Sequence, residues 1–198
     1  MMPLALSRRV RRALVLSTGQ TTQYGGLADD GFYEKGELHR YTVLTTGQYS
    51  GTVNITLNGK TDVHSNACVM DDATGLMWSR TVSASVGPTS NGLLPWTTNG
   101  SGEGIFTYAA AANTAGLAGY SDWRIPNLFE LITLCDYEAS TAYPNATAFP
   151  SWSANAVYSS TTGPSLTTGA MFILFASGAV SRQDKALTGM GLLVRGPL

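Results

Sequence analysis

The sequence predicts an α+β fold made of short strands, long loops and two helices. Its composition is the first reason: the 198 residues include 22 glycines and many serines, threonines and asparagines, which favour turns, and only 13% are charged. The second reason is an Asn-Gly turn between two alternating segments, and the third is a pair of segments with helical spacing. The 43% of hydrophobic residues suffice for the core of one ordinary domain.

The strands are expected in two groups. Asn58-Gly59 supplies the positive φ angles of a type I′ turn inside TVNITLNGKTDV, so this segment predicts a hairpin. The segment ACVMDDATGLMWSR predicts two more strands around an Asp-Ala-Thr-Gly turn. After a long loop over residues 81–104, four short closing strands are expected in VYSSTT, GAMFILFAS, AVSRQDK and GLLVRG.

Both helices lie between these groups of strands. The first is expected over residues 104–117, with Phe106, Ala110 and Leu117 on its apolar stripe and Gly116 as a C-terminal stop. The second is expected over residues 126–137, because Pro126 suits a first helical turn and apolar residues follow at helix-face spacing.

Charge divides the chain into a basic arm over residues 1–16 and one domain over residues 17–198. Four of the twelve basic residues are Arg8, Arg9, Arg11 and Arg12, and the remainder is acidic on balance. The arm could bind nucleic acid, an anionic membrane or an acidic protein, or it could be a solvated tail, whereas the acidic body argues against wholesale nucleic-acid binding. We expect no signal peptide and no membrane span.

Residues with reactive or metal-binding chemistry are few and scattered. Cys68 and Cys135 are far apart and are expected to be buried free thiols, although one disulfide is possible in principle. His39 and His64 are isolated and are expected at the surface or in turns. The pair Asp71-Asp72 is expected to build the turn before Thr74-Gly75 rather than to bind calcium. We therefore predict no catalytic residues, no metal site and no cofactor.

The segment GYSDWRIPNLFEL combines a tryptophan, an Asp-Arg pair and a proline. Residues two apart in an extended segment share a face, so Asp122 and Arg124 are expected to pair on one side while Trp123 packs on the other. An active-site reading would need a nucleophile or base nearby. The structural reading, a corner that holds a loop against the start of a helix, is the stronger.

This segment and three others carry a family resemblance: DDATGLMWSR, AGLAGYSDWRIPNLFELITLCDY, AFPSW followed by VYSSTT, and the closing LLVRG. Together they resemble the family typified by the C-terminal domain of the Legionella collagen-like adhesin. The resemblance implies a C-type-lectin-like fold, with two helices on small twisted antiparallel sheets and long loops. It also implies scaffold roles for eight residues, with Asn127 as a cap or turn residue before the second helix: Thr74, Gly75, Trp78, Asp122, Trp123, Arg124, Pro126 and Asn127.

The candidate ligand-binding residues lie in loops and closing strands. Aromatic side chains are favoured at interfaces, and Trp96, Tyr143 and Tyr158 stand in or beside loop-like segments. Arg182, Asp184 and Lys185 complete the candidate set. Simple packing is the expected role of Trp78, Trp123 and Trp152. The C-terminal Arg195 is expected to pair with an acidic residue of the body.

Two settings fit a non-enzymatic recognition module. The basic arm, the absence of a recognised signal peptide and the single domain predict a bacteriophage virion protein that decorates a capsid or tail or binds a host-surface glycan or protein. Display proteins of this kind are expected to form homo-oligomers, and a trimer is predicted. In this setting the arm over residues 1–16 is expected to be the anchor, extended along a neighbouring subunit. The alternative is a bacterial surface adhesin-type domain, or a receptor-binding domain diversified over residues 152–193.

Overall fold

The computed structural model describes residues 16–18, 20–23, 30, 36–97, 99–138, 143–150, 152 and 155–196. The four arginines of the predicted arm lie outside the described residues. The described part is α+β, as predicted, with three small sheets and two α-helices. None of its helices has the length and apolar character needed to cross a membrane.

Strands β1 to β5, together with the C-terminal strand β11, form two of the sheets. β2 and β3 are an isolated hairpin, and β1, β4, β5 and β11 form a four-stranded antiparallel sheet in the order β1-β4-β5-β11. The bounds of these strands are β1 Tyr41–Leu44, β2 Thr52–Leu57, β3 Lys60–Ser65, β4 Cys68–Asp71, β5 Leu76–Ser79 and β11 Val194–Arg195. The predicted turn is confirmed, because Asn58 and Gly59 adopt φ angles of 50° and 73° between β2 and β3.

The third sheet has five strands in the order β6-β10-β7-β8-β9. Its strands are β6 Leu93–Pro95, β7 Val157–Thr162, β8 Gly169–Leu174, β9 Ala179–Asp184 and β10 Thr188–Met190. β10 pairs antiparallel with β6 and parallel with β7. β6 lies in the segment expected to be a continuous loop. Its three residues have no alternating pattern and depend on pairing with a strand some ninety residues later in the chain, so local sequence does not reveal it.

The first predicted helix is confirmed as α2, Ile105–Ala115, and Gly116 closes it in the left-handed region with φ 70°. Its predicted apolar stripe is wrong, because Phe106 and Ala110 are exposed and the buried face carries Tyr108, Ala109 and Ala112. The second predicted helix, α3, is much shorter than expected and spans Leu128–Ile132. Backbone hydrogen bonds from Leu134 to Leu131 and from Cys135 to Ile132 span only three residues, so the chain tightens there and inserts both later side chains into the core. Asn127 caps α3 as predicted, in a capping box with Glu130.

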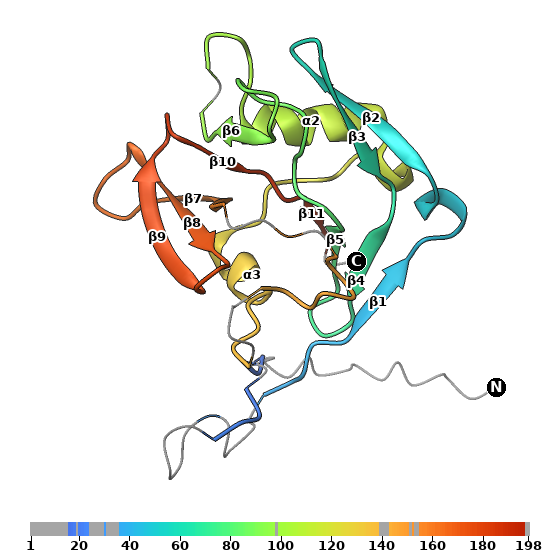
Figure 1. Cartoon of the computed structure of the whole chain (residues 1–198), viewed down its shortest axis with the longest axis vertical. Coiled ribbons are helices and arrows are strands. Elements are labelled where there is room, and N and C mark those ends of the chain that lie inside the picture. The colour runs from blue at the N-terminus through green and yellow to red at the C-terminus, as the bar shows by residue number, and fades with distance from the viewer. Residues whose placement is uncertain are drawn as a thin grey trace, which may run out of the picture.

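The helices and sheets enclose two hydrophobic clusters. In Figure 1, α2 lies with the β2-β3 hairpin at one end of the molecule, and α3 lies near β7 and β8. The cluster under α2 contains Tyr108 and Trp123, whereas the cluster under α3 contains Trp78, Leu131 and Phe149. Short 3₁₀ turns at Gly47–Tyr49 and Leu117–Gly119 complete the described helical structure.

Candidate recognition surface and pocket

The end of β9 and the turn after it bring together four of the six candidate ligand-binding residues. We call Trp96, Arg182, Asp184 and Lys185 the Trp96–Lys185 surface. The Lys185 backbone is held from both sides, because its N–H donates to Thr168 O and its carbonyl accepts from the Trp96 N–H. The Lys185 Nζ lies 4.0 Å from the centre of the Trp96 ring and donates to Thr162 Oγ1 at 3.0 Å.

The Trp96 side chain is fixed rather than mobile. Its Nε1 donates to the carbonyl oxygen of Ser159 at 2.7 Å, and its ring meets the edge of Phe106 with the ring centres 4.7 Å apart. One face of the indole is already covered by the Lys185 ammonium. Trp96 therefore acts as a rigid support for a cation, and that face does not offer a free platform for stacking on a sugar.

Arg182 lies three residues before Lys185, so its side chain leaves β9 on the opposite face of the sheet. Its aliphatic part covers Gly163 and Gly169, where an added Cβ would come within 2.4 and 2.6 Å of Arg182 Cδ, and its Nη1 donates to Pro164 O at 3.3 Å. Lys185 contacts Thr162 on one face and Arg182 covers Gly163 on the other, so the two cations flank the edge strand β9 from opposite faces. Neither forms a salt bridge with a carboxylate of the described residues. Asp184 caps the turn by accepting from the Ala186 N–H.

The remaining candidates, Tyr143 and Tyr158, are packing residues in the structure. Tyr158 is fully buried, and its hydroxyl donates to Leu187 O at 2.9 Å and accepts from Gln183 Nε2 at 2.6 Å. Burial raises the pKa of Tyr158 above its usual value. Its ring cannot reach a surface ligand, but it anchors the turn that carries Lys185. Tyr143 is half-buried against the cluster under α3.

The predicted ion pair between Asp122 and Arg124 is wrong, because each residue has another partner. Arg195 Nε donates to Asp122 Oδ1 at 2.7 Å, which confirms the expected acidic partner of Arg195, and Arg124 forms a fork of two hydrogen bonds with Glu130. Arg124 is bridged through its backbone to Val194, so the segment is held as a strand-like corner. The packing role of Trp123 is confirmed by its 2% exposure.

The remaining scaffold residues also have structural roles. Asp71 accepts hydrogen bonds from the Ala73 N–H and the Thr74 hydroxyl, so it builds the turn at Gly75 as predicted. Trp78 is buried in β5, and Pro126 precedes the cap of α3. Among the described residues, no group of three or more histidine, cysteine, aspartate or glutamate side chains is placed to hold a metal ion.

Both histidines lie deeper than expected. His64 is 2% exposed and is bonded to Ser65 O and to Thr81, so its predicted surface position is wrong. His39 is half-buried, and its Nδ1 lies 3.0 Å from Asp71 Oδ2. The partial burial of His39 could have been predicted from its position two residues before Tyr41, because residues two apart in an extended segment share a face. Their rings stack with centres 5.4 Å apart.

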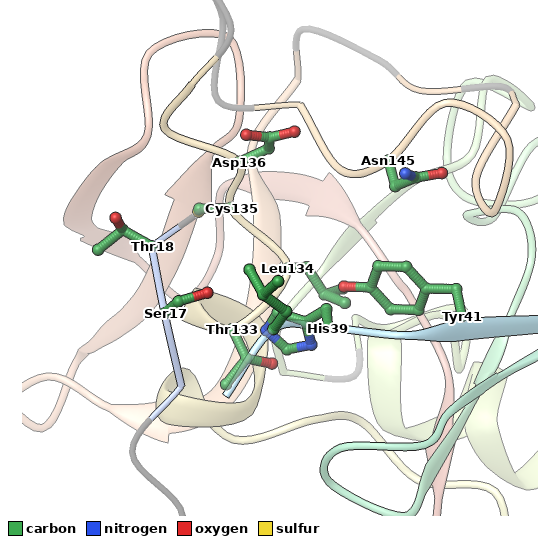
Figure 2. Close-up of a pocket in the computed structure, with 10 residues that line it drawn as sticks. Ser17, Thr18, His39, Tyr41, Thr133, Leu134, Cys135, Asp136 and Asn145 are labelled. Atoms are coloured by element: carbon green, nitrogen blue, oxygen red, sulfur yellow. The ribbon is translucent and has the colours of Figure 1, made fainter. Parts of the chain in front are cut away.

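His39 and Tyr41 line a pocket of about 140 Å³ between the N-terminal segment and the exit of α3 (Figure 2). The other lining residues are Ser17, Thr18, Leu38, Thr133, Leu134, Cys135, Asp136 and Asn145. Cys135 and Cys68 are buried free thiols, as predicted. Burial raises the pKa of both thiols, and that of Cys68 reaches about 12. Neither cysteine is therefore present as a nucleophilic thiolate near neutral pH.

Most of the scaffold described above matches a single protein family. The family described as the Lcl C-terminal domain matches residues 67–195. This chain belongs to that family. The match includes α2, α3, the Asp122–Arg195 contact and the Trp96–Lys185 surface, whereas Ser17 and His39 precede it. A comparison with curated proteins found no match.

Proposed function

We propose that this chain is a non-enzymatic, adhesin-type recognition domain with a C-type-lectin-like fold, which acts at a bacterial cell surface and binds a host glycan or protein. Membership of the Lcl C-terminal domain family supports an adhesin-type role. The two helices and small, mostly antiparallel sheets are compatible with the lectin-like architecture. The family match favours this setting over the virion that the sequence alone suggested. Trimer formation and the anchoring role of the arginine-rich arm stay predictions.

The observation that carries the proposal is the pair of cations on the Trp96–Lys185 surface. Lys185 is held by Trp96 and by the turn that Tyr158 anchors, whereas Arg182 is exposed on the other face of β9; no described carboxylate neutralises either cation. Two cations without a carboxylate partner at one sheet edge favour an acidic group, and Lys185 is already held in place before the ligand binds. We therefore expect the ligand to present a carboxylate or another acidic group, on a sugar or on a protein.

Replacing Arg182 and Lys185 together by glutamine should weaken binding to this ligand about 100-fold, since each charge-assisted hydrogen bond contributes roughly a factor of ten. The measurement is a glycan array probed with the wild-type chain and with the Arg182→Gln/Lys185→Gln variant. Ser181→Ala, an exposed change on the same strand, is the control. If acidic glycans were bound equally by both proteins, the surface would not be the binding site.

Gly169→Ala tests the position of the charge without removing it. The new Cβ would displace the Arg182 side chain, which is flexible, while the total charge stays the same. We expect binding between that of the wild type and that of the double variant. Gly100→Ala, where a Cβ has no neighbour within 4 Å, should bind like the wild type.

A further inference from the structure

Two buried polar atoms of residues that line the pocket in Figure 2, His39 Nε2 and Ser17 Oγ, have no hydrogen-bond partner within the described part of the chain. Buried polar groups in folded proteins are normally paired, so two orphans lining one cavity need an explanation. Ser17 is positioned by its backbone, since its N–H donates to Glu37 O at 3.0 Å, two residues before His39. In Figure 2 the Ser17 hydroxyl points toward His39.

The hydrogen-bonding role of His39 Nε2 follows from the other ring nitrogen. Asp71 is fully buried, and although burial favours its neutral form, hydrogen bonds from His39 and Thr74 lower its pKa below the ordinary value. Asp71 is therefore a carboxylate, and the His39 Nδ1 must carry a proton to donate to it. When the ring is neutral, Nε2 carries a lone pair and can accept a hydrogen bond.

The rest of the lining disfavours an anion. No lysine or arginine is among the described residues that line the pocket, while Asp136 is one of its lining residues and Asp71 contacts His39. An anion would thus meet acidic groups without a cation to compensate. Leu38, Leu134 and the body of Tyr41 supply apolar surface for C–H groups.

We propose that this pocket binds a neutral, hydroxyl-bearing group of the size of one ring, such as a single sugar residue or a small polyol. One ligand hydroxyl donates to His39 Nε2 and accepts from the Ser17 hydroxyl, so a single oxygen satisfies both orphan groups. An ammonium group could only donate, and it would leave the Ser17 proton without an acceptor. The volume of this cavity, about 140 Å³, is close to that of an engineered protein cavity that binds benzene.

This site shares no residue with the Trp96–Lys185 surface and does not depend on the proposed adhesin function. The two proposals also differ in ligand charge, because one surface carries unpaired cations and the other is neutral to acidic. Each can therefore fail without the other.

The test uses the two histidines of the chain as reporters. Histidine ring nitrogens are labelled with ¹⁵N in the whole protein, and their NMR shifts are followed during titration with glycerol, D-glucose, D-galactose and N-acetyl-D-glucosamine. Methylammonium chloride and sodium acetate are the charged probes. We expect at least one polyol to shift His39 Nε2 in a saturable manner. His64 is the internal reference, since both its nitrogens are bonded within the fold.

Ser17→Ala removes only an unpartnered hydroxyl, so it should leave the fold and the His64 signals unchanged. It should weaken the binding of the active polyol about tenfold, the loss of one hydrogen bond to a buried partner. Ser181→Ala should bind as the wild type does. The proposal is overturned if no polyol shifts His39, if acetate or methylammonium shifts it at lower concentration than every polyol, or if Ser17→Ala binds with unchanged affinity.

Discussion

Trp123→Ala should lower the free energy of unfolding by about 4 kcal/mol, within the range measured when a large buried aromatic side chain is truncated. Trp123 packs in the cluster under α2, and its Nε1 donates to Leu117 O at 2.9 Å. Its backbone N–H and carbonyl are both bonded to the Asn113 side chain, which joins the corner to α2. Chemical denaturation followed by circular dichroism measures the effect.

Conservative variants separate packing from hydrogen bonding. Trp78 is as deeply buried as Trp123, but its Nε1 has no partner within the described residues. Phenylalanine at either position removes similar volume, whereas only Trp123→Phe leaves a buried carbonyl without its donor. We expect Trp123→Phe to be less stable than Trp78→Phe by about 1 kcal/mol. Equal losses would show that the Leu117 contact contributes nothing.

Asp122→Asn should destabilise the fold by about 2 kcal/mol, because it leaves the buried Arg195 without a counter-charge. The Arg195 side chain is 8% exposed, and two of its nitrogens bond the two Asp122 oxygens at 2.7 and 3.1 Å. The guanidinium also stacks on Tyr120, 3.7 Å from the ring centre. Breaking a fully buried pair costs about 3–5 kcal/mol, and the 58% exposure of Asp122 reduces that figure.

The same pair predicts a pH dependence. The hydrogen bond from Arg195 holds the pKa of Asp122 below its ordinary value of 3.8. A lowered pKa in the folded state contributes stability that is fully present above the unfolded value and is lost as the pH falls through the folded value. The stability difference between wild type and Asp122→Asn should therefore be constant above about pH 5 and shrink below about pH 4.

Asp184→Asn is the matched control for this pair. Asp184 has no salt bridge among the described residues, and asparagine keeps the oxygen that accepts from Ala186. It should change stability by less than about 0.5 kcal/mol. A loss as large as that of Asp122→Asn would mean that the effect reports general charge removal.

Local chemistry decided which parts of this fold were predictable. The Asn58-Gly59 turn, the Gly116 helix stop and the Asn127 cap each depend on a few neighbouring residues, and all three were predicted correctly. The pairings across the corner were not, because alternation places Asp122 and Arg124 on one face but does not reveal Arg195 or Glu130 as better partners. β6 escaped prediction for the same reason, since its partner is distant in sequence.

The same distinction between local chemistry and contacts distant in sequence applies to the candidate sites. Arg182 and Lys185 were named from the sequence, but the adjacency of their contacts at Thr162 and Gly163 depends on how β7, β8 and β9 pair. Tyr158 is an aromatic residue of a type that often contacts ligands. Only its burial in the structure shows that it supports the turn instead. The pocket joins four separate segments, so no single motif could have indicated it.

The central claim, recognition through the Trp96–Lys185 surface, is tested most directly by adhesion of protein-coated beads to cultured host cells. Beads carrying the wild-type chain, the Arg182→Gln/Lys185→Gln variant or Ser181→Ala are counted after washing, on untreated cells and on cells stripped of surface glycans. The account predicts that wild-type and Ser181→Ala beads are retained and that the double variant is lost. Retention of the double variant at the wild-type level, or no retention of wild-type beads on either type of cell, would contradict it.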